Sequence, residues 1–150
     1  MTTVFDVPAK ELIDAAAKKL QKESAISTPE ENLFTRTGVS RENPPINKDW
    51  WYIRCASILR KIYIKNSIGI EQLRAEYGGG KNRGSKPSKA RSGSGSIARR
   101  AVQQLEKAGY VTRIKGKGRV LTPKGRSFLD NTSHEVMKNV GAYYPGLEKY

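Results

Sequence analysis

The segment from residue 48 to residue 64 constrains the fold most, because it carries apolar side chains on both sides of a helix. At 100° per residue, one broad face gathers Trp51, Tyr52, Cys55, Ala56, Leu59, Ile62 and Tyr63. The other side carries Trp50, Ile53 and Ile64 among basic residues. A helix that is apolar on both sides is typical of the centre of a domain. We therefore predict a central helix over about 48–64, capped by Asn47, with Leu59 in the middle of its broad face.

Four further helices and one β-hairpin are predicted around this segment. Apolar spacing places the helices at about 8–24, 68–77, 96–108 and 123–138, and the hairpin at 110–121. We expect Asp6 to cap the first helix, the glycines 78–80 to close the 68–77 helix, Gly109 to end the 96–108 helix, and Thr122 to cap the last helix. The outward side of the 96–108 helix is predicted to carry Arg99, Arg100, Gln103, Gln104 and Lys107. The fold class is therefore mainly α, with about five helices around a central amphipathic helix.

Two connections differ from these segments in composition. Residues 25–47 hold three prolines and little periodicity, so we expect an irregular connection that packs against the domain. Residues 79–95 are rich in glycine, serine, lysine and arginine, a composition that buries little apolar surface. We expect this second connection to be a basic, mobile strap. With 150 residues, the chain has the size of one domain, 1–150.

The positive charge is concentrated in the middle of the chain. Residues 77–129 hold 14 basic side chains and one acidic side chain, Glu106, whereas residues 1–76 hold 12 and 10. A solvated protein surface normally mixes both signs, and a block of one sign repels itself unless it meets a polyanion. The distribution therefore favours a polyanion as the partner.

Several function classes are excluded by what the chain lacks. One cysteine and one histidine supply neither a disulfide framework nor a Cys/His zinc site, so we expect no metal, no cofactor and a reducing compartment. The sequence has no apolar run long enough to span a membrane and no signal-peptide pattern at its start. Cys55 is interpreted as a small buried apolar residue.

The order of the elements matches a winged helix, in which the helix before the hairpin approaches nucleic acid and the hairpin is the wing. A DNA-reading helix-turn-helix joins its two helices by about three or four residues. Here the connection from Gly78 to Gly95 is much longer and basic. Such a connection suits the phosphates and the shape of folded RNA, so RNA is preferred to DNA.

The sequence resembles the nineteenth small-subunit ribosomal protein family of the archaeal and eukaryotic series, in its archaeal form. The run DWWYIRCASILRKIY at 49–63 carries most of this resemblance. Further matching stretches are 69–71, 77–79, 94–100, 104–106, 116–119 and 121–125, with a shorter one at 29–38. Glu31 stands where that family commonly has tryptophan, and Cys55 stands where it has a small residue.

The resemblance implies a structural constituent of the small ribosomal subunit. Such a protein binds ribosomal RNA in the subunit head, is needed for subunit assembly or maturation, and works on the ribosome in the cytoplasm. Its partners would be small-subunit ribosomal RNA and neighbouring ribosomal proteins, and the free protein would be a monomer. The family's RNA contacts fall on Arg54, Arg60, Arg99 and Arg100. From charge alone we add Lys61, Lys81, Arg83, Lys86, Lys89, Arg91, Lys115, Lys117 and Arg119.

Alternatives remain for several of these features. Arg54 and Arg60 could instead form structural ion pairs with Asp49 or Glu71. A winged-helix transcription regulator that binds DNA is the second candidate function, and an RNA-processing enzyme is the third. The enzyme would need carboxylates or a histidine near the basic residues, and 77–129 offers only Glu106.

Three local motifs have structural explanations, and a fourth stays open. The glycines before Lys81 lack the remaining residues of a phosphate-binding loop. His134 has no nucleophile beside it in the helical pattern, so we expect an exposed surface residue. Of the adjacent Trp50 and Trp51, we expect Trp51 in the core. The C-terminal segment 139–150, with tyrosines at 143 and 144, is either a packed tail or an anchor for a partner.

Overall fold

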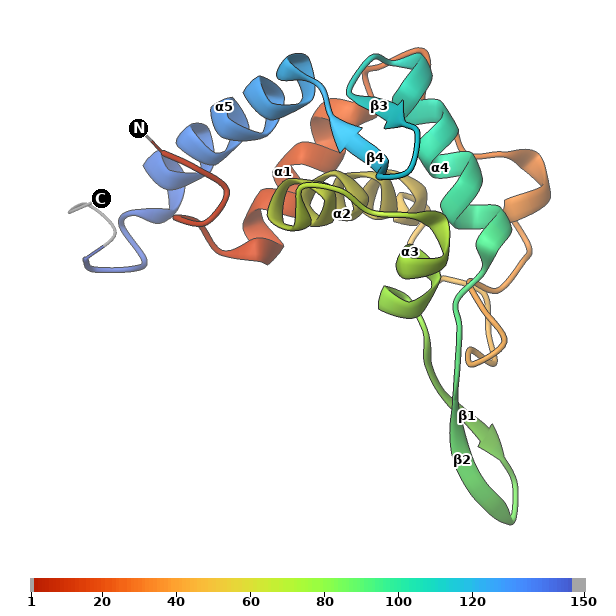
Figure 1. Cartoon of the computed structure of the whole chain (residues 1–150). Coiled ribbons are helices and arrows are strands. Elements are labelled where there is room, and N and C mark those ends of the chain that lie inside the picture. The colour runs from red at the N-terminus through yellow and green to blue at the C-terminus, as the bar shows by residue number, and fades with distance from the viewer. Residues whose placement is uncertain (1, 147–150) are drawn as a thin grey trace.

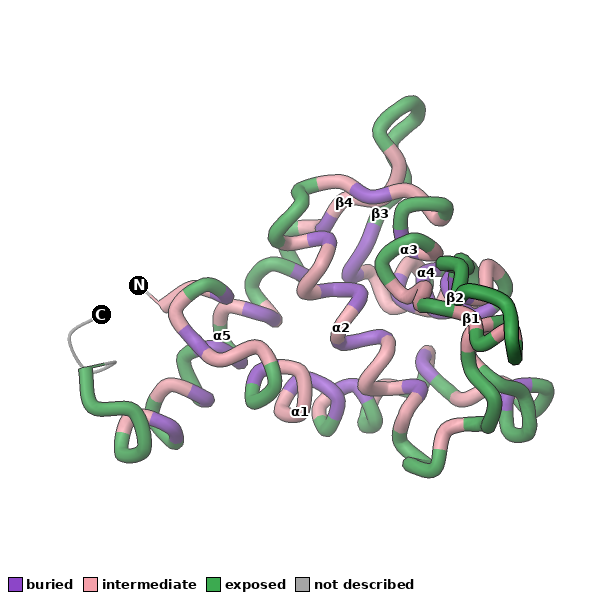
Figure 2. Tube along the Cα trace, turned by 90° about the horizontal axis from the view of Figure 1, so that it is seen from below, coloured by how far each residue is buried: buried purple, intermediate pink, exposed green. Residues whose placement is uncertain are grey.

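Helix α2 (Trp50–Lys65) lies at the centre of the structure, a computed structural model that describes residues 2–146. Its buried side chains are Trp51, Cys55, Ala56, Ile58, Leu59 and Ile62. It packs against α1 (Ala9–Leu20), α4 (Gly95–Lys107) and α5 (Pro123–Val140), so that buried residues follow its length (Figure 2). The predictions of a central helix, and of Trp51, Cys55 and Leu59 in the core, are confirmed.

The second half of the chain forms the winged-helix-like part. Helix α3 (Ile70–Glu76) packs on α4, and the hairpin of β3 (Val111–Ile114) and β4 (Gly118–Leu121) follows α4 (Figure 1). Ile68 joins this hairpin through two backbone hydrogen bonds with Arg119, whose N···O distances are 3.0 and 2.9 Å. The predicted class, mainly α with five helices and a winged-helix-like order, is confirmed.

Gly118 permits the close approach of the wing to residue 68. Its φ of +97° lies in the region that favours glycine, and an added Cβ would lie 2.8 Å from the carbonyl oxygen of Ile68. A side chain at this position would therefore push β4 away from the link between α2 and α3.

The segment between α3 and α4 is a second β-hairpin, so the expectation of a single small hairpin was wrong and the strap has regular structure; its mobility stays a prediction. Strands β1 (Gly79–Arg83) and β2 (Lys86–Arg91) pair antiparallel and project from the body (Figure 1). The prediction failed because it judged this segment by how much apolar surface its residues can bury. The β-ladder is instead formed by backbone hydrogen bonds, which do not depend on apolar side chains. Gly84, with φ +69°, and Ser85 make the turn, a two-residue signal that was available in the sequence.

The base of the β1–β2 hairpin is tied to the body on two sides. Gly93 N–H donates to the Arg74 carbonyl at 2.8 Å, and Ser94 N–H donates to the Thr37 carbonyl at 3.1 Å. Gly38 forms an isolated β-bridge with Gly93. The connection 25–47 therefore packs as expected; it also contains a short 3-10 helix, η1 (Glu30–Asn32).

Three predicted helix caps were wrong. The Asp6 carboxylate accepts from the backbone N–H of Thr3 at 2.6 Å, and Pro8 precedes α1. The Asn47 side chain accepts from Asp49 N–H at 2.9 Å, so it fixes the turn before α2 rather than the helix end. The glycines 78–80 do not close α3, since Tyr77 ends it and the strand β1 starts at Gly79. The side chains of Asp6 and Asn47 accept from backbone N–H groups outside the helices that they were expected to cap, and the glycines lead into a strand instead.

The predicted end of α4 and the predicted cap of α5 are confirmed. Gly109, with φ +81°, follows α4, and the Thr122 hydroxyl accepts from Gly125 N–H at 3.2 Å to cap α5. Ser94, two residues before the expected start, caps α4.

Gln104 was predicted to face outward and instead joins three segments. Its Oε1 accepts from the Trp51 indole N–H at 2.8 Å and from Ser27 N–H at 3.3 Å. Its Nε2 donates to the Ser27 carbonyl at 2.8 Å. The prediction failed because the irregular connection covers this side of α4, which helical periodicity does not show.

Candidate nucleic-acid interface

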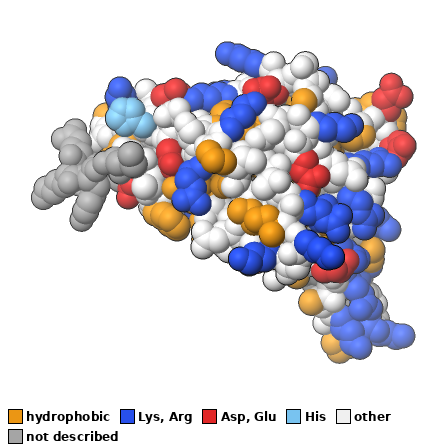
Figure 3. Space-filling view, turned by 45° about the horizontal axis from the view of Figure 1, so that its top comes forward, with side chains coloured by type: hydrophobic (Ala, Val, Ile, Leu, Met, Phe, Trp, Pro, Cys, Tyr) orange, Lys and Arg blue, Asp and Glu red, His pale blue; other side chains and the backbone are white. Residues whose placement is uncertain are grey.

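The β1–β2 hairpin carries the densest group of the predicted RNA-binding residues. Lys86, Lys89 and Arg91 are exposed, and Lys81 and Arg83 are half-exposed. The space-filling view shows their blue side chains gathered on the projecting hairpin (Figure 3). No acidic residue lies between residues 77 and 105, so nothing on the hairpin itself neutralises this charge.

The register of the hairpin places like charges opposite each other. Lys81 pairs with Lys89, and Arg83 pairs with Lys86 across the turn. Directly opposed like charges destabilise a β-ladder. An alternative explanation for these charges is that positive side chains on an edge strand prevent it from pairing with strands of other chains. Repulsion within the hairpin would be relieved by an anion that contacts both strands.

The basic residues of α4 and of the wing divide into free and paired groups. Arg99, Lys115 and Lys117 are exposed. Arg100 pairs with Glu31 at 2.5 Å, and Arg119 pairs with Glu106 at 3.0 Å. Glu31 is the residue at which the sequence differs from the family it resembles. In the structure, its carboxylate contacts Arg100, a predicted RNA-binding residue. Both partners are far from the arginines in sequence, which is why sequence reasoning missed them.

Lys61 on α2 forms an ion pair with a carboxylate of the same chain. Its Nζ lies 2.7 Å from the Glu76 carboxylate, which also pairs with Lys65. Hydrogen bonds from Lys61 and then Lys65 lower the pKa of Glu76 to about 2. The pair ties α2 to the end of α3, a structural role for Lys61 that its position on the basic side did not reveal.

Arg54 is stacked on an aromatic ring. Its guanidinium carbon lies 4.0 Å from the centroid of the Tyr77 ring, and the Tyr77 hydroxyl donates to Ser57 Oγ at 2.7 Å. Burial lowers the pKa of Arg54, and the nearby charge of Arg41 lowers it further. Tyr77 and Arg41 are neighbours that sequence reasoning did not associate with this site.

The alternative of structural ion pairs for Arg54 and Arg60 is contradicted. Within residues 2–146, no carboxylate lies within ion-pair distance of either guanidinium, and Glu71 pairs with Arg74 at 3.0 Å instead. The Nε of Arg60 is buried without a hydrogen-bond partner in the same part of the chain. Neither arginine therefore forms an ion pair within residues 2–146, and contact of either one with RNA stays a prediction.

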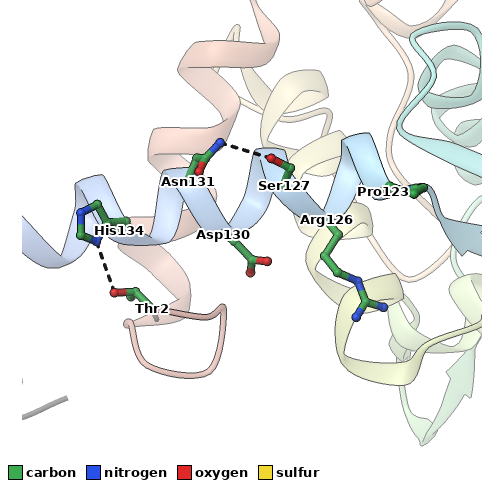
Figure 4. A pocket seen from close by; sticks show the side chains of 7 residues that line it. All are labelled: Thr2, Pro123, Arg126, Ser127, Asp130, Asn131 and His134. Carbon is green, nitrogen blue, oxygen red and sulfur yellow. Dashed lines mark hydrogen bonds between the residues drawn. The ribbon is translucent and has the colours of Figure 1, made fainter.

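A hollow runs along α5, at the opposite end of the molecule from the β1–β2 hairpin (Figure 4). Its lining mixes Arg126 with Asp130, and His134 lies 3.4 Å from the Thr2 hydroxyl. His134 is exposed, as predicted, and its contact with the Thr2 hydroxyl lies at the surface. The mixed charge of this hollow contrasts with the single sign of the β1–β2 hairpin.

The described part of the chain offers no cluster of three or more His, Cys, Asp or Glu side chains that could hold a metal ion. Nor does it contain a helix that is both long and apolar enough to cross a membrane. At the C-terminal end, Tyr143 is 81% and Tyr144 is 48% exposed, so these rings are not packed in the core. The rest of the predicted tail, residues 147–150, lies outside the described residues.

Comparison with known proteins agrees with these features. The family described as ribosomal protein S19e matches residues 3–139. Small ribosomal subunit protein eS19 of Aeropyrum pernix is 45% identical over all of this chain and 99% of that protein, and the one of Thermoplasma acidophilum is 43% identical over the same shares. Small ribosomal subunit protein eS19G of Ascaris suum is 40% identical over 92% of this chain and 94% of that protein. The chain therefore belongs to the ribosomal protein S19e family.

Proposed function

We propose that this chain binds ribosomal RNA in the head of the small ribosomal subunit and is needed for the assembly of that subunit. Membership of the S19e family makes it a ribosomal component of the cytoplasm and not an enzyme. The basic surface described above supports RNA contact, and the family resemblance is the ground for the role in assembly. Neighbouring small-subunit proteins would be its other partners.

The observation that carries the proposal is the β1–β2 hairpin. It projects from the body, bears five basic side chains without a carboxylate, and sets Lys81 opposite Lys89. Phosphate groups of RNA would supply the negative charge that these opposed basic side chains lack. Arg99 and the wing residues Lys115 and Lys117 would extend this contact along the winged-helix-like half.

The RNA proposal is preferred to DNA binding by a winged-helix regulator. A DNA-reading motif needs a short turn between its two helices so that the second one can enter the major groove. Here a 13-residue hairpin, 79–91, stands between α3 and α4 and leads directly into the start of α4. The hairpin would meet the nucleic acid before the helix could dock in a groove.

The experiment is sedimentation of a tagged chain through a high-salt gradient. We expect the wild-type chain to migrate with the small subunit. The double variant Lys81→Gln/Lys89→Gln should incorporate less. The control Lys10→Gln/Lys18→Gln, which removes the same charge from exposed positions of α1, should incorporate normally. A wild-type chain that stays at the top of the gradient would contradict the proposal.

A further inference from the structure

A hollow between the irregular connection and α2 has a different character from the rest of the basic surface. It measures about 440 Å³ and is lined by residues of α1, the 37–45 part of the connection, α2 and Tyr77. Ligand pockets in proteins typically measure about 300 to 1,000 Å³. The hollow therefore has room for a ligand of the size of one nucleotide.

The walls of this hollow combine flat apolar surface with positive charge. Trp50 and Ile53 line it from α2; Trp50 is half-exposed, and its ring makes a T-shaped contact with the Trp51 ring at a centroid distance of 5.4 Å. Arg41 and Arg54 also line it, and the Arg54 guanidinium lies over the Tyr77 ring. No described residue that lines the hollow is acidic. An anion that entered the hollow would meet two guanidinium groups that no carboxylate of the lining offsets.

The polar groups suit a nucleobase as well as a phosphate. Asn43 lines the hollow and offers both a carbonyl acceptor and an amide donor, the pair of groups that reads the edge of a base. Unpaired bases of RNA are typically splayed out and stacked on aromatic rings or arginine planes. A base inside a double helix cannot reach such a wall, because it is paired and stacked on its neighbours.

We propose that this hollow binds one unpaired, flipped-out nucleotide of ribosomal RNA. Trp50 and Ile53 would contact the face of the base, Asn43 would read its edge, and Arg41 and Arg54 would hold its phosphate. This inference rests on the proposed function and adds to it a single-nucleotide site distinct from the hairpin. An acidic protein segment is the other anion that could occupy the hollow, but it would leave the flat walls and the amide unused.

The first test uses the free protein and the four nucleoside monophosphates AMP, GMP, CMP and UMP. We expect at least one of them to shift the Trp50 indole N–H resonance, and the matching nucleoside without phosphate to bind roughly tenfold more weakly. Arg41→Gln should weaken the monophosphate by about tenfold, while Lys48→Gln should change its affinity by less than about twofold. Arg41 and Lys48 are both exposed residues before α2, but only Arg41 lines the hollow. Equal effects of the two variants, or no shift with any monophosphate, would overturn the inference.

The second test uses assembled small subunits and chemical probing of the base edges of their RNA. With the wild-type chain, one unpaired nucleotide should be protected, and it should become reactive in subunits that carry Asn43→Ala or Arg41→Gln. Lys48→Gln subunits should keep the protection. If the variants enter subunits and no nucleotide changes its reactivity, the hollow holds something else, such as an acidic protein segment, and the inference is wrong. A wild-type chain that fails to enter subunits contradicts the proposed function itself, so the two failures are distinguishable.

Discussion

Replacement of Gln104 by alanine should destabilise the protein far more than its position on a basic helix face suggests. The Trp51 side chain is fully buried, and its indole N–H donates only to Gln104 Oε1 among the described residues. A buried donor without an acceptor costs about 1 to 3 kcal/mol. The two bonds to Ser27 lie nearer the surface, where water replaces part of each, and add about 1 kcal/mol together.

The expected total is about 2 to 4 kcal/mol, which lowers the melting temperature by roughly 10 °C for a domain of this size. The assay is urea unfolding and thermal melting followed by circular dichroism. Gln103→Ala is the matched control, because the neighbouring residue is exposed and should change stability by less than about 0.5 kcal/mol.

A double-mutant cycle identifies the cause. In a Trp51→Phe background the indole N–H is absent, so Gln104→Ala should cost less than about 1.5 kcal/mol. Equal stabilities of Gln104→Ala and Gln103→Ala, or an undiminished effect in the Phe background, would refute the role given to this hydrogen bond.

Three further predictions concern other parts of the structure. Leu59→Ala removes a fully buried side chain from α2 and should cost about 2 to 5 kcal/mol, whereas Arg60→Leu removes a buried, unpartnered Nε and should melt no earlier than the wild type. Gly118→Ala should cost about 2 to 4 kcal/mol in urea unfolding because it combines a positive φ with a Cβ 2.8 Å from the Ile68 carbonyl; Gly116→Ala, with φ +80° and open space around it, should cost about 1 kcal/mol. The pKa of Glu76 falls from 4.5 to about 2 on folding, so its ion pairs contribute above pH 4.5 and are lost as the pH falls to 2. Stability measured over that range should fall less in Glu76→Gln than in the wild type, by up to about 1 kcal/mol since the pair is partly solvated.

Helical periodicity was sufficient to predict α2 and most of its core residues. It missed Ile58, which is fully buried, and it placed Tyr52 and Tyr63 on the apolar face although both are only half-buried. Apolar side chains recur along residues 51–62 at the spacing of one helix face, and most of these side chains are buried in the structure. The positive φ of Gly109 and the Thr122 cap were also predictable, because each depends on a residue type with a specific local preference.

The β1–β2 hairpin and the paired arginines were not predictable in the same way. The hairpin is held by backbone hydrogen bonds and has no apolar pattern, so only its Gly84–Ser85 turn gave a signal. The contacts of Arg100 with Glu31 and of Lys61 with Glu76 join residues far apart in sequence, which neither spacing nor composition reports. The same holds for the hollow, whose walls come from segments that only the fold brings together.

The most direct test of RNA contact is the salt dependence of the affinity for a structured fragment of small-subunit ribosomal RNA. Between 50 and 200 mM salt, log affinity should fall by about 0.7 to 0.9 per neutralised phosphate for each tenfold rise in salt. Engagement of four or more basic side chains of the hairpin and of α4 predicts a slope of about −3 or steeper. Lys81→Gln/Lys89→Gln should make that slope shallower by roughly 1.5, and Lys10→Gln/Lys18→Gln should leave it unchanged. A slope near zero, or an equal effect of the two double variants, would contradict RNA binding through the β1–β2 hairpin.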